Sequence, residues 1–219
     1  MKIGIVGAGR IGGNLASLWA KQHHEVMLSY SRDPEHLEQA ASAIGARAKA
    51  GTVREAVEFG DVILFSVPWS RIDEVIEEMG DLDGKVVIDT TNQFGPNGVE
   101  ELPDGKTAAQ INKERLRGAK YAKAFNTLTA GFQAAAAGRT GPDRVVMFYA
   151  TDHDDAAGIA EELISATGFD PVRAGTLRRT DVGHQEPKGD VYGEEFHLPE
   201  ARDRVAALRG TPPSGRGRP

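Results

Sequence analysis

The hydrophobic positions of the chain form short continuous runs that alternate with longer amphipathic segments. Runs of Val, Ile and Leu without polar alternation are typical of parallel strands that are buried on both faces. Seven segments have or approach this character: residues 2–6, 25–30, 61–67, 85–90, 121–125, 144–150 and 171–174. The pattern therefore predicts seven strands.

Apolar residues between these runs recur at helical spacing. Ile11, Leu15, Leu18 and Trp19 share one face of a helix predicted over residues 10–22. Capping residues and periodicity predict further helices over residues 34–45, after Thr52, after the capping residue Ser70, over 154–167 and over 199–209. Because strands that alternate with helices form βαβ units, we expect a Rossmann-like, doubly wound α/β fold with a mostly parallel sheet.

The end of this alternation divides the chain into parts. Residues 1–175 contain all the predicted strands and are expected to form the Rossmann-like domain. Residues 176–210 are expected to be a short helical C-terminal appendage, and residues 211–219 a disordered tail, because they have no apolar residue able to anchor them. Residues 91–106 are rich in Gly, Pro and Asn and predict a long loop.

Composition excludes several classes of protein. The net charge of −6 argues against non-specific nucleic-acid binding, and the absence of cysteine excludes disulfides, thiolate catalysis and sulfur-ligated metals. The acidic run 152–155 is interpreted as an ordinary helix start, so no metal is expected. No apolar run approaches the ~18–20 residues of a membrane span. The first strand leaves no room for a signal peptide, so we expect a cytoplasmic protein.

Three glycines join the first predicted strand to the first predicted helix. Gly7, Gly9 and Gly12 form the pattern G-x-G-x-x-G. In a βαβ unit, the first permits a tight turn, the second lets the backbone approach a pyrophosphate, and the third lets helix and strand pack closely. A glycine-rich structural turn is the alternative, but the position between strand and helix favours a dinucleotide whose phosphates lie at the helix N-terminus.

The end of the second strand indicates which dinucleotide is bound. Sites for NAD usually place Asp or Glu there, to accept hydrogen bonds from the ribose hydroxyl. This chain has Ser31 and Arg32, which would instead bind the 2′-phosphate of NADP(H). Asp33 could be the ribose partner, but Pro34 after it favours a helix N-cap. We therefore expect NADP(H).

Other strands are followed by residues that should line the same crevice, outside the carboxyl ends of the strands. One group follows the strand expected beside the first: Ser66, Val67, Pro68 and Trp69. Trp69 either covers the cofactor or fills the core. Asn92 and Asn126 follow the next two strands and should lie at the nicotinamide end, although each could instead cap its loop through an Asx turn.

These motifs together resemble a known family. G-x-G-x-I-G-G-N-L-A, S-R-D-P, S-V-P-W, I-D-T-T-N and A-F-N-T resemble the NADP-dependent oxidoreductases related to F-420:NADP oxidoreductase, over about residues 1–175. The resemblance implies hydride transfer between NADP(H) and a deazaflavin coenzyme. It also implies nucleotide contacts at Gly9, Arg10, Ile11, Ser31, Arg32, Val67 and Pro68. Archaeal deazaflavin-using members tend to read H-T-I where this chain has Asn126-Thr127-Leu128, so the resemblance implies NADP more strongly than the acceptor.

The size of the chain restricts the site of the hydride acceptor. About 35 residues after the last strand are too few for a separate substrate domain. The acceptor site must therefore be completed by the 91–106 loop, the 176–197 segment or a second subunit of a homodimer. An open site of this kind suits a planar small-molecule acceptor, a flavin or deazaflavin such as F-420, with Asn126 orienting a ring or the carboxamide.

Two other functions stay open from the sequence. The first is an NADPH-dependent reductase of a small carbonyl or imine, for which His184 or Tyr192 could act in proton transfer. The second is an NADP(H)-sensing module without turnover, because no catalytic set stands out. Glu186 and His197 lie in the same segment, and a polar surface segment tying the last helix to the sheet is the alternative interpretation of all four residues.

Overall fold

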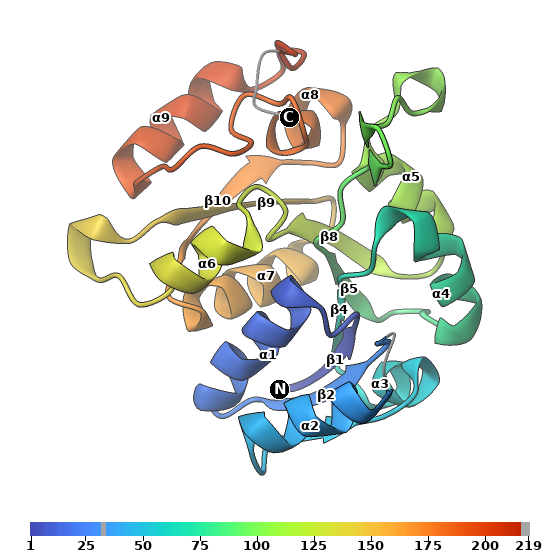
Figure 1. Ribbon diagram of the computed structural model, residues 1–219. Coiled ribbons are helices and arrows are strands. Elements are labelled where there is room, and N and C mark those ends of the chain that lie inside the picture. Colours follow the sequence, from blue (N-terminus) through green and yellow to red (C-terminus); the bar gives the residue numbers. More distant parts are fainter. Residues whose placement is uncertain (32–33, 216–219) are drawn as a thin grey trace.

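In the computed structural model, which describes residues 1–31 and 34–215, eight strands form one sheet in the order β10-β9-β8-β5-β4-β1-β2-β3 (Figure 1). The strands are β1 (Lys2–Val6), β2 (Glu25–Ser29), β3 (Ala48–Ala50), β4 (Val62–Phe65), β5 (Val86–Asp89), β8 (Lys120–Ala124), β9 (Val146–Thr151) and β10 (Asp170–Gly175). All neighbours run parallel except β8 and β9, whose register pairs Ala122 with Thr151. The predicted Rossmann-like, doubly wound α/β fold is confirmed.

Helices cover both faces of this sheet (Figure 1). One face packs against α1 (Arg10–Lys21), α2 (Pro34–Ile44), α6 (Ala130–Ala136) and α7 (Asp154–Ala166). The other packs against α3 (Val53–Phe59), α4 (Ile72–Met79), α5 (Ala108–Arg115) and α8 (Arg179–Val182). Successive strand residues alternate between the two cores, so Ile3 and Ile5 face the first and Ile63 and Phe65 the second. The continuous apolar runs follow from this double burial.

All seven predicted strands are present, and the differences lie in short or polar elements. The prediction missed β3, which has only three partly exposed residues. The prediction also missed α5, because its residues are mostly polar and do not show an apolar face. Thr107 and Gln110 form a capping box at its start. Ser70 does not cap α4 as predicted, because it lies inside a 3-10 turn and Arg71 is the residue that precedes the helix.

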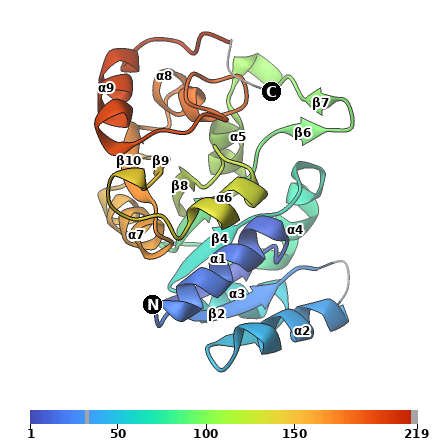
Figure 2. The same ribbon diagram turned by 60° about the vertical axis from the view of Figure 1, so that its left-hand side comes forward.

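The segment predicted as a long loop, 91–106, contains a small hairpin of β6 (Phe94–Gly95) and β7 (Gly98–Val99). It is followed by a 3-10 turn at Pro103–Gly105. Figure 2 shows the hairpin standing out from the body of the molecule beside α5. The hairpin is too short to give a strand pattern in the sequence.

The C-terminal appendage packs on the β9–β10 end of the sheet. Helix α9 (Leu198–Leu208) buries Ala201 and Val205 against Phe148 and Val172. Thr211 accepts a hydrogen bond from His184 through its carbonyl oxygen, and the amide of Ser214 donates to Asp190. Thr211 and Ser214 of the predicted tail therefore contact the appendage, and residues 216–219 lie outside the described residues.

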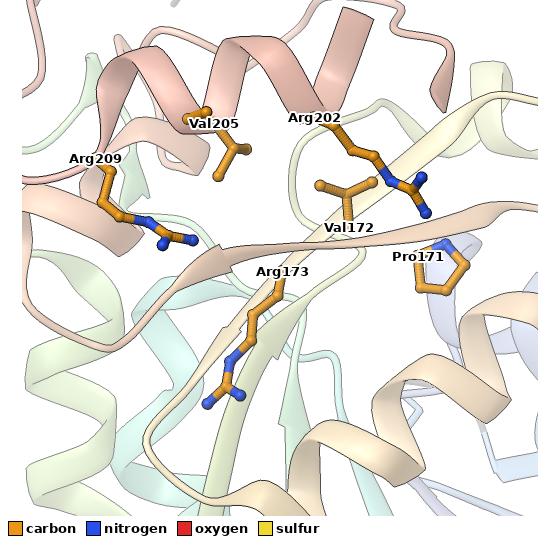
Figure 3. Close-up of a pocket in the computed structure, with 7 residues that line it drawn as sticks. Pro171, Val172, Arg173, Arg202, Val205 and Arg209 are labelled. Carbon is orange, nitrogen blue, oxygen red and sulfur yellow. The ribbon is translucent and has the colours of Figure 1, made fainter. Parts of the chain in front are cut away.

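Strand β10 forms one edge of the sheet, and charged side chains surround it (Figure 3). Pro171 offers no N–H to a further strand. Arg202 of α9 and Arg209, directly after this helix, line the cavity beside β10. Arg173 bonds to Asp154 and to the carbonyl oxygen of Thr151. A cavity of about 410 Å³ lies between α9 and the strand. Proline and charge at an edge strand hinder pairing with another chain.

Candidate functional site

A cleft of about 1440 Å³ lies along the carboxyl ends of the parallel strands. Eleven of the thirteen predicted site residues line it: Gly7, Gly9, Arg10, Ile11, Ser31, Ser66, Val67, Pro68, Trp69, Asn92 and Asn126. Gly12 lies behind this lining, and Arg32 lies outside the described residues. The cleft is therefore at the position where doubly wound sheets bind their ligands, beside the reversal of strand order between β1 and β4.

The glycine turn between β1 and α1 has the geometry of a phosphate cradle. Gly7 has a φ of 108°, and a Cβ there would lie 2.3 Å from the carbonyl oxygen of Ser66. A Cβ on Gly12 would lie 2.0 Å from the carbonyl oxygen of Gly7, whereas a Cβ on Gly9 would meet nothing within 4 Å. Gly7 and Gly12 thus allow close packing, and Gly9 leaves open space before the N-terminus of α1. These residues fit a pyrophosphate.

The end of β2 holds this turn in place. The carbonyl oxygen of Ser29 accepts hydrogen bonds from the amides of Gly7 and Ala8, and the Ser29 hydroxyl donates to the carbonyl oxygen of Ile5. Tyr30 then adopts a φ of 54°, a conformation that β-branched and bulky residues rarely occupy. The chain turns sharply here, and Ser31 follows in the cleft wall.

The cleft wall is free of carboxylates over the part of the chain that the structure describes. Its charged or titratable side chains there are Arg10, His36, Arg71 and the two phenols of Tyr30 and Tyr192. An anion entering the cleft therefore meets positive charge and backbone N–H groups rather than acidic side chains. This arrangement suits a phosphorylated ligand.

Trp69 belongs to the cleft wall and also supports the neighbouring hairpin. Its indole N–H donates to the carboxylate of Glu100 at 3.1 Å, and the guanidinium of Arg115 lies 5.2 Å from its ring centroid. Arg115 in turn bonds to Asp73 at the start of α4. The half-buried Trp69 side chain packs against the core on the α3–α5 face of the sheet and also lines the cleft.

The two asparagines at the ends of β5 and β8 form one network. The amide of Asn126 donates to Asn92 Oδ1 at 3.1 Å and to the carbonyl oxygen of Gln185 at 2.7 Å. Asn92 donates to the carbonyl oxygen of Asn126 at 2.9 Å and approaches the hydroxyl of Tyr192 at 3.5 Å. Phe125 precedes Asn126 with a φ of 57°, a strained conformation of the kind found at functional sites. The backbone thus presents both amides at the same end of the cleft.

Asn92 is the better placed of the two to touch a ligand. Asn126 is 2% exposed and its two amide hydrogens are already donated within the protein. Asn92 is half-buried, in the wall beside Tyr192. Asn126 also lines the cleft, and the bond from its side chain restrains the Asn92 amide.

A buried polar network behind this wall was not anticipated from the sequence. Asp89 accepts hydrogen bonds from Tyr121, Lys123 and Asn112, and Asn112 and Lys123 also donate to Thr91 in the cleft wall. Asp89 and Lys123 are fully buried. The sequence signal for this network is a charged residue inside an otherwise apolar strand, where only a paired charge is tolerated.

The residues considered for acid–base roles lie in different places. Tyr192 lines the cleft, and burial raises the pKa of its hydroxyl. His184 is buried outside the cleft wall, with its ring nitrogens bonded to Asp190 and to the carbonyl oxygen of Thr211. His197 bonds to the carbonyl oxygen of Arg144. The structure therefore gives His184 and His197 structural partners rather than a place in the cleft.

Glu186 connects the appendage to the start of α5. Its two carboxylate oxygens accept the amides of Ala108 and Ala109, at 2.8 and 2.7 Å. Burial raises the pKa of this carboxyl, against the opposing effects of Lys123 and the two amides. Its side chain does not line the cleft, so among the described residues it supports the fold next to the site.

Two kinds of feature are absent from the described residues, a membrane-spanning helix and a metal-binding group of side chains. No helix among them combines the length and apolarity needed to cross a membrane. Over the same residues, no group of three His, Asp or Glu side chains is placed to hold a metal ion. The acidic run 152–155 starts α7 as predicted, with Asp154 and Asp155 in its first turn.

Comparisons with known proteins agree with this site. Residues 2–93 match the family described as NADP oxidoreductase, coenzyme F420-dependent. The crystal structure of hypothetical protein SMa0349 from Sinorhizobium meliloti is similar over 90% of this chain and 95% of its own, at 31% identity and a TM-score of 0.79. No curated protein matches the chain significantly.

More distant structures share the fold. One is a protein from Arthrobacter sp. FB24 described as an F420-dependent NADP reductase, at 19% identity and a TM-score of 0.69, over 84% of this chain and 88% of its own. Another is an imine reductase from Myxococcus stipitatus in complex with NADP+, at 18% identity and a TM-score of 0.61. The alignment with it covers 95% of this chain but 60% of the imine reductase.

The fold and the cradle at its carboxyl edge define a protein of the Rossmann-like dinucleotide-binding class. Within that class, residues 2–93 form a domain of the NADP oxidoreductase, coenzyme F420-dependent, family.

Proposed function

We propose that this protein is an NADP(H)-dependent oxidoreductase that transfers hydride between NADP(H) and a planar flavin or deazaflavin of the F-420 type. The observation that carries the proposal is the composition of one continuous cleft. A glycine cradle opens at one end, the Asn92–Asn126 pair closes the other, and no described side chain in the wall is a carboxylate. The family match of residues 2–93 supports the same function.

The proposed binding mode for NADP(H) follows from the cradle. The N-terminus of α1, with Gly9, Arg10 and Ile11, would hold the pyrophosphate, and Ser31 would contact the 2′-phosphate. A reductive aminase from Aspergillus terreus and the imine reductase from Myxococcus stipitatus share the fold and were solved with NADPH and NADP+ respectively, which supports this cofactor. Arg32 would add a second contact to the 2′-phosphate, as expected from the sequence.

The chemistry needs little acid–base help from the protein. When bound, the nicotinamide supplies or accepts one hydride, and the proton that completes reduction of a flavin or deazaflavin comes from water. The side chains of the wall would orient the reacting rings and exclude solvent between them. Asn92, held by Asn126, is proposed to bind a ring or the carboxamide. A second subunit of a homodimer could complete the outer side of the acceptor site.

One observation favours a second candidate, an NADPH-dependent reductase of a small imine or carbonyl. Tyr192 places a hydroxyl in the cleft beside Asn92, where it could donate a hydrogen bond or a proton. The imine reductases of similar fold add to this candidate. His184, the other residue considered for this role, lies outside the cleft wall. A sensing module without turnover is the remaining alternative.

An NADPH-oxidation screen tests the proposal. The acceptors are deazaflavin, riboflavin, FMN, and a panel of cyclic imines and small carbonyls, each at one concentration of enzyme and NADPH. Turnover with a ring acceptor is the expected result. Turnover with only an imine or carbonyl would replace the proposal with the second candidate. Binding of NADPH without turnover of any acceptor would leave the sensing module.

A further inference from the structure

The side chain of Phe94 is exposed at the wall of the cleft. It is 42% exposed, and no other large hydrophobic side chain of the described residues is classed as exposed. It lies two residues after Asn92 and lines the same cleft. A ligand that covers this ring removes apolar surface from water, and this contributes to its binding.

The hairpin that carries Phe94 is small but fixed at its base. Only two residue pairs hold it together, Phe94 with Val99 and Gly95 with Gly98. The amide of Glu100 donates to the carbonyl oxygen of Gln93 at 2.8 Å and closes the base. Two strands of two residues are not stable alone, so contacts to the rest of the fold must set the position of the hairpin.

The Glu100 side chain supplies such a contact. Its carboxylate accepts the indole N–H of Trp69 and lies across Gly95, where an added Cβ would come within 2.0 Å of it. Trp69 is itself held by the guanidinium of Arg115. The hairpin is therefore tied to the cleft wall through a side chain that also belongs to that wall.

We infer that Phe94 forms the outer face of the acceptor site, on which a planar multi-ring acceptor stacks. This inference rests on the proposed function and adds to it the residue that selects the acceptor. Aromatic rings prefer offset-stacked or edge-to-face contact with other rings, and such contacts stabilise beyond the area they bury. A flavin or deazaflavin offers three fused rings to this contact. A small aliphatic imine or carbonyl offers no ring and gains little from it.

Four variants test the inference. Phe94→Ala and Phe94→Leu remove the ring, Phe94→Tyr retains it, and Phe59→Ala removes a half-buried phenylalanine from α3, outside the cleft. For each we would measure the KM and kcat with the best ring acceptor, the Kd of that acceptor from its fluorescence quenching, and the Kd of NADPH. Circular dichroism and thermal melts establish that each variant is folded.

Phe94→Ala and Phe94→Leu should raise the acceptor KM and Kd by about fivefold to tenfold, the loss of one ring contact. The Kd of NADPH should stay within about twofold, and Phe94→Tyr and Phe59→Ala should resemble the wild type. Unchanged acceptor constants in Phe94→Ala, with a wild type that reduces a ring acceptor, would overturn the inference and leave the proposed function intact. A wild type that reduces no ring acceptor would overturn both.

Discussion

Asn92 and Asn126 hold each other across the ends of two neighbouring strands. Asn126 donates its side-chain amide to Asn92 Oδ1 at 3.1 Å, and Asn92 donates its own to the Asn126 carbonyl oxygen at 2.9 Å. Because the two bonds engage both the nitrogen and the oxygen of the Asn92 amide, they give it one defined orientation in the cleft. The pair therefore fixes a polar group at the end of the cleft farthest along the sheet from the glycine turn.

Removing Asn126 should slow hydride transfer more than it weakens NADPH binding. In Asn126→Ala the Asn92 amide keeps its bond to the backbone carbonyl oxygen of residue 126 but loses the bond that its Oδ1 accepts, so its orientation is less fixed. A small misplacement of reacting groups costs about tenfold to a hundredfold in rate. The carbonyl oxygen of Gln185 and Asn92 Oδ1 also lose a donor, which should cost about 1–3 kcal/mol of stability. Stopped-flow NADPH oxidation with the best acceptor, and the Kd of NADPH, measure the two effects.

A stability-matched variant separates orientation from general loosening. Thr52→Ala removes the N-cap of α3, away from the cleft, and should cost about 1 kcal/mol. It should keep the wild-type rate, whereas Asn126→Ala should not. If both variants slow transfer equally, or if Asn126→Ala weakens NADPH binding as much as it lowers the rate, the orienting role of the asparagine pair is wrong.

The glycines of the first turn should respond differently to the same change. Gly9→Val adds a side chain to open space where the pyrophosphate is expected, so the protein should fold and lose NADPH binding. Gly12→Ala places a Cβ within 2.0 Å of the carbonyl oxygen of Gly7, so it should destabilise the fold itself. Thermal melts with and without NADPH check both expectations, because a bound ligand raises the melting temperature.

NADPH should raise the melting temperature of the wild type. Gly9→Val should have the wild-type melting temperature without NADPH and should show no increase when NADPH is added. Gly131→Val serves as a control, because Gly131 also has open space for a Cβ but lies in α6 outside the cleft wall. A normal NADPH shift in Gly9→Val would place the nucleotide elsewhere.

Continuous apolar runs made the sheet predictable from the sequence. Of the strands buried on both faces, β4 has no polar residue, and β1 and β5 have one each, at an end of the strand. Such a pattern is distinct from that of a helix. The glycine turn and the strand-end residues were predictable because the fold places the carboxyl ends of parallel strands at one edge. Their gathering around one cleft follows from topology and not from their spacing in the chain.

Features that depend on tertiary contacts were not predictable. Helix α5 has a polar composition, and the Glu186 carboxylate holds its start. This carboxylate accepts hydrogen bonds from the backbone N–H groups of Ala108 and Ala109, which lie 78 and 77 residues away in the chain. The side chain of Gln185 meets Asn126 in the same way, over 59 residues. The position of His184 in the chain left open a role as a proton donor. Its hydrogen bonds to Asp190 and Thr211, which the sequence does not indicate, hold it outside the cleft. Such pairs leave no periodic signal.

An acid at the end of β2 should reverse the preference between the two nucleotides. The wild type is expected to bind NADPH more tightly than NADH. Ser31→Asp would repel a 2′-phosphate and accept from a ribose hydroxyl, so it should weaken NADPH and strengthen NADH. Arg32→Ala should weaken NADPH binding by about tenfold or more, since a charge-assisted contact contributes about 1.5–3 kcal/mol. Titrations of both nucleotides against the wild type and the two variants measure this.

Equal affinity of the wild type for NADPH and NADH would contradict this assignment. So would a loss in Arg32→Ala that is the same for both nucleotides, because it would reflect damage to the shared part of the site. Arg47→Ala, in the turn before β3 and outside the cleft wall, removes a surface guanidinium as a control.

Removal of the Tyr192 hydroxyl should distinguish the two candidate reactions. Ring-to-ring hydride transfer should keep its rate within about threefold in Tyr192→Phe, because the water supplies the proton. Reduction of an imine or carbonyl would fall by about a hundredfold or more if this hydroxyl donates. Burial raises the pKa of Tyr192 above its usual value of 10, so no titration of it should appear between pH 6 and 9. The rates of both reactions across this range are the measurement, and His184→Ala, buried away from the cleft wall, is the structural control.

The stability of the fold beside the site should depend on pH through Glu186. Burial raises the pKa of this carboxyl above the value of about 4.5 that it has in the unfolded chain. The protonated carboxyl therefore makes its full contribution to the stability of the fold below that value. The contribution is lost as the pH rises through the pKa of the folded state.

Glu186→Gln cannot lose a proton, although its amide can satisfy only one of the two N–H groups of Ala108 and Ala109. The melting temperature of the wild type should exceed that of Glu186→Gln by the largest margin at pH 4.5, and this margin should shrink toward pH 8. Glu58→Gln, on the exposed surface of α3, should follow the wild type. A constant difference between the wild type and Glu186→Gln would show that the Glu186 carboxyl does not hold its proton in the fold.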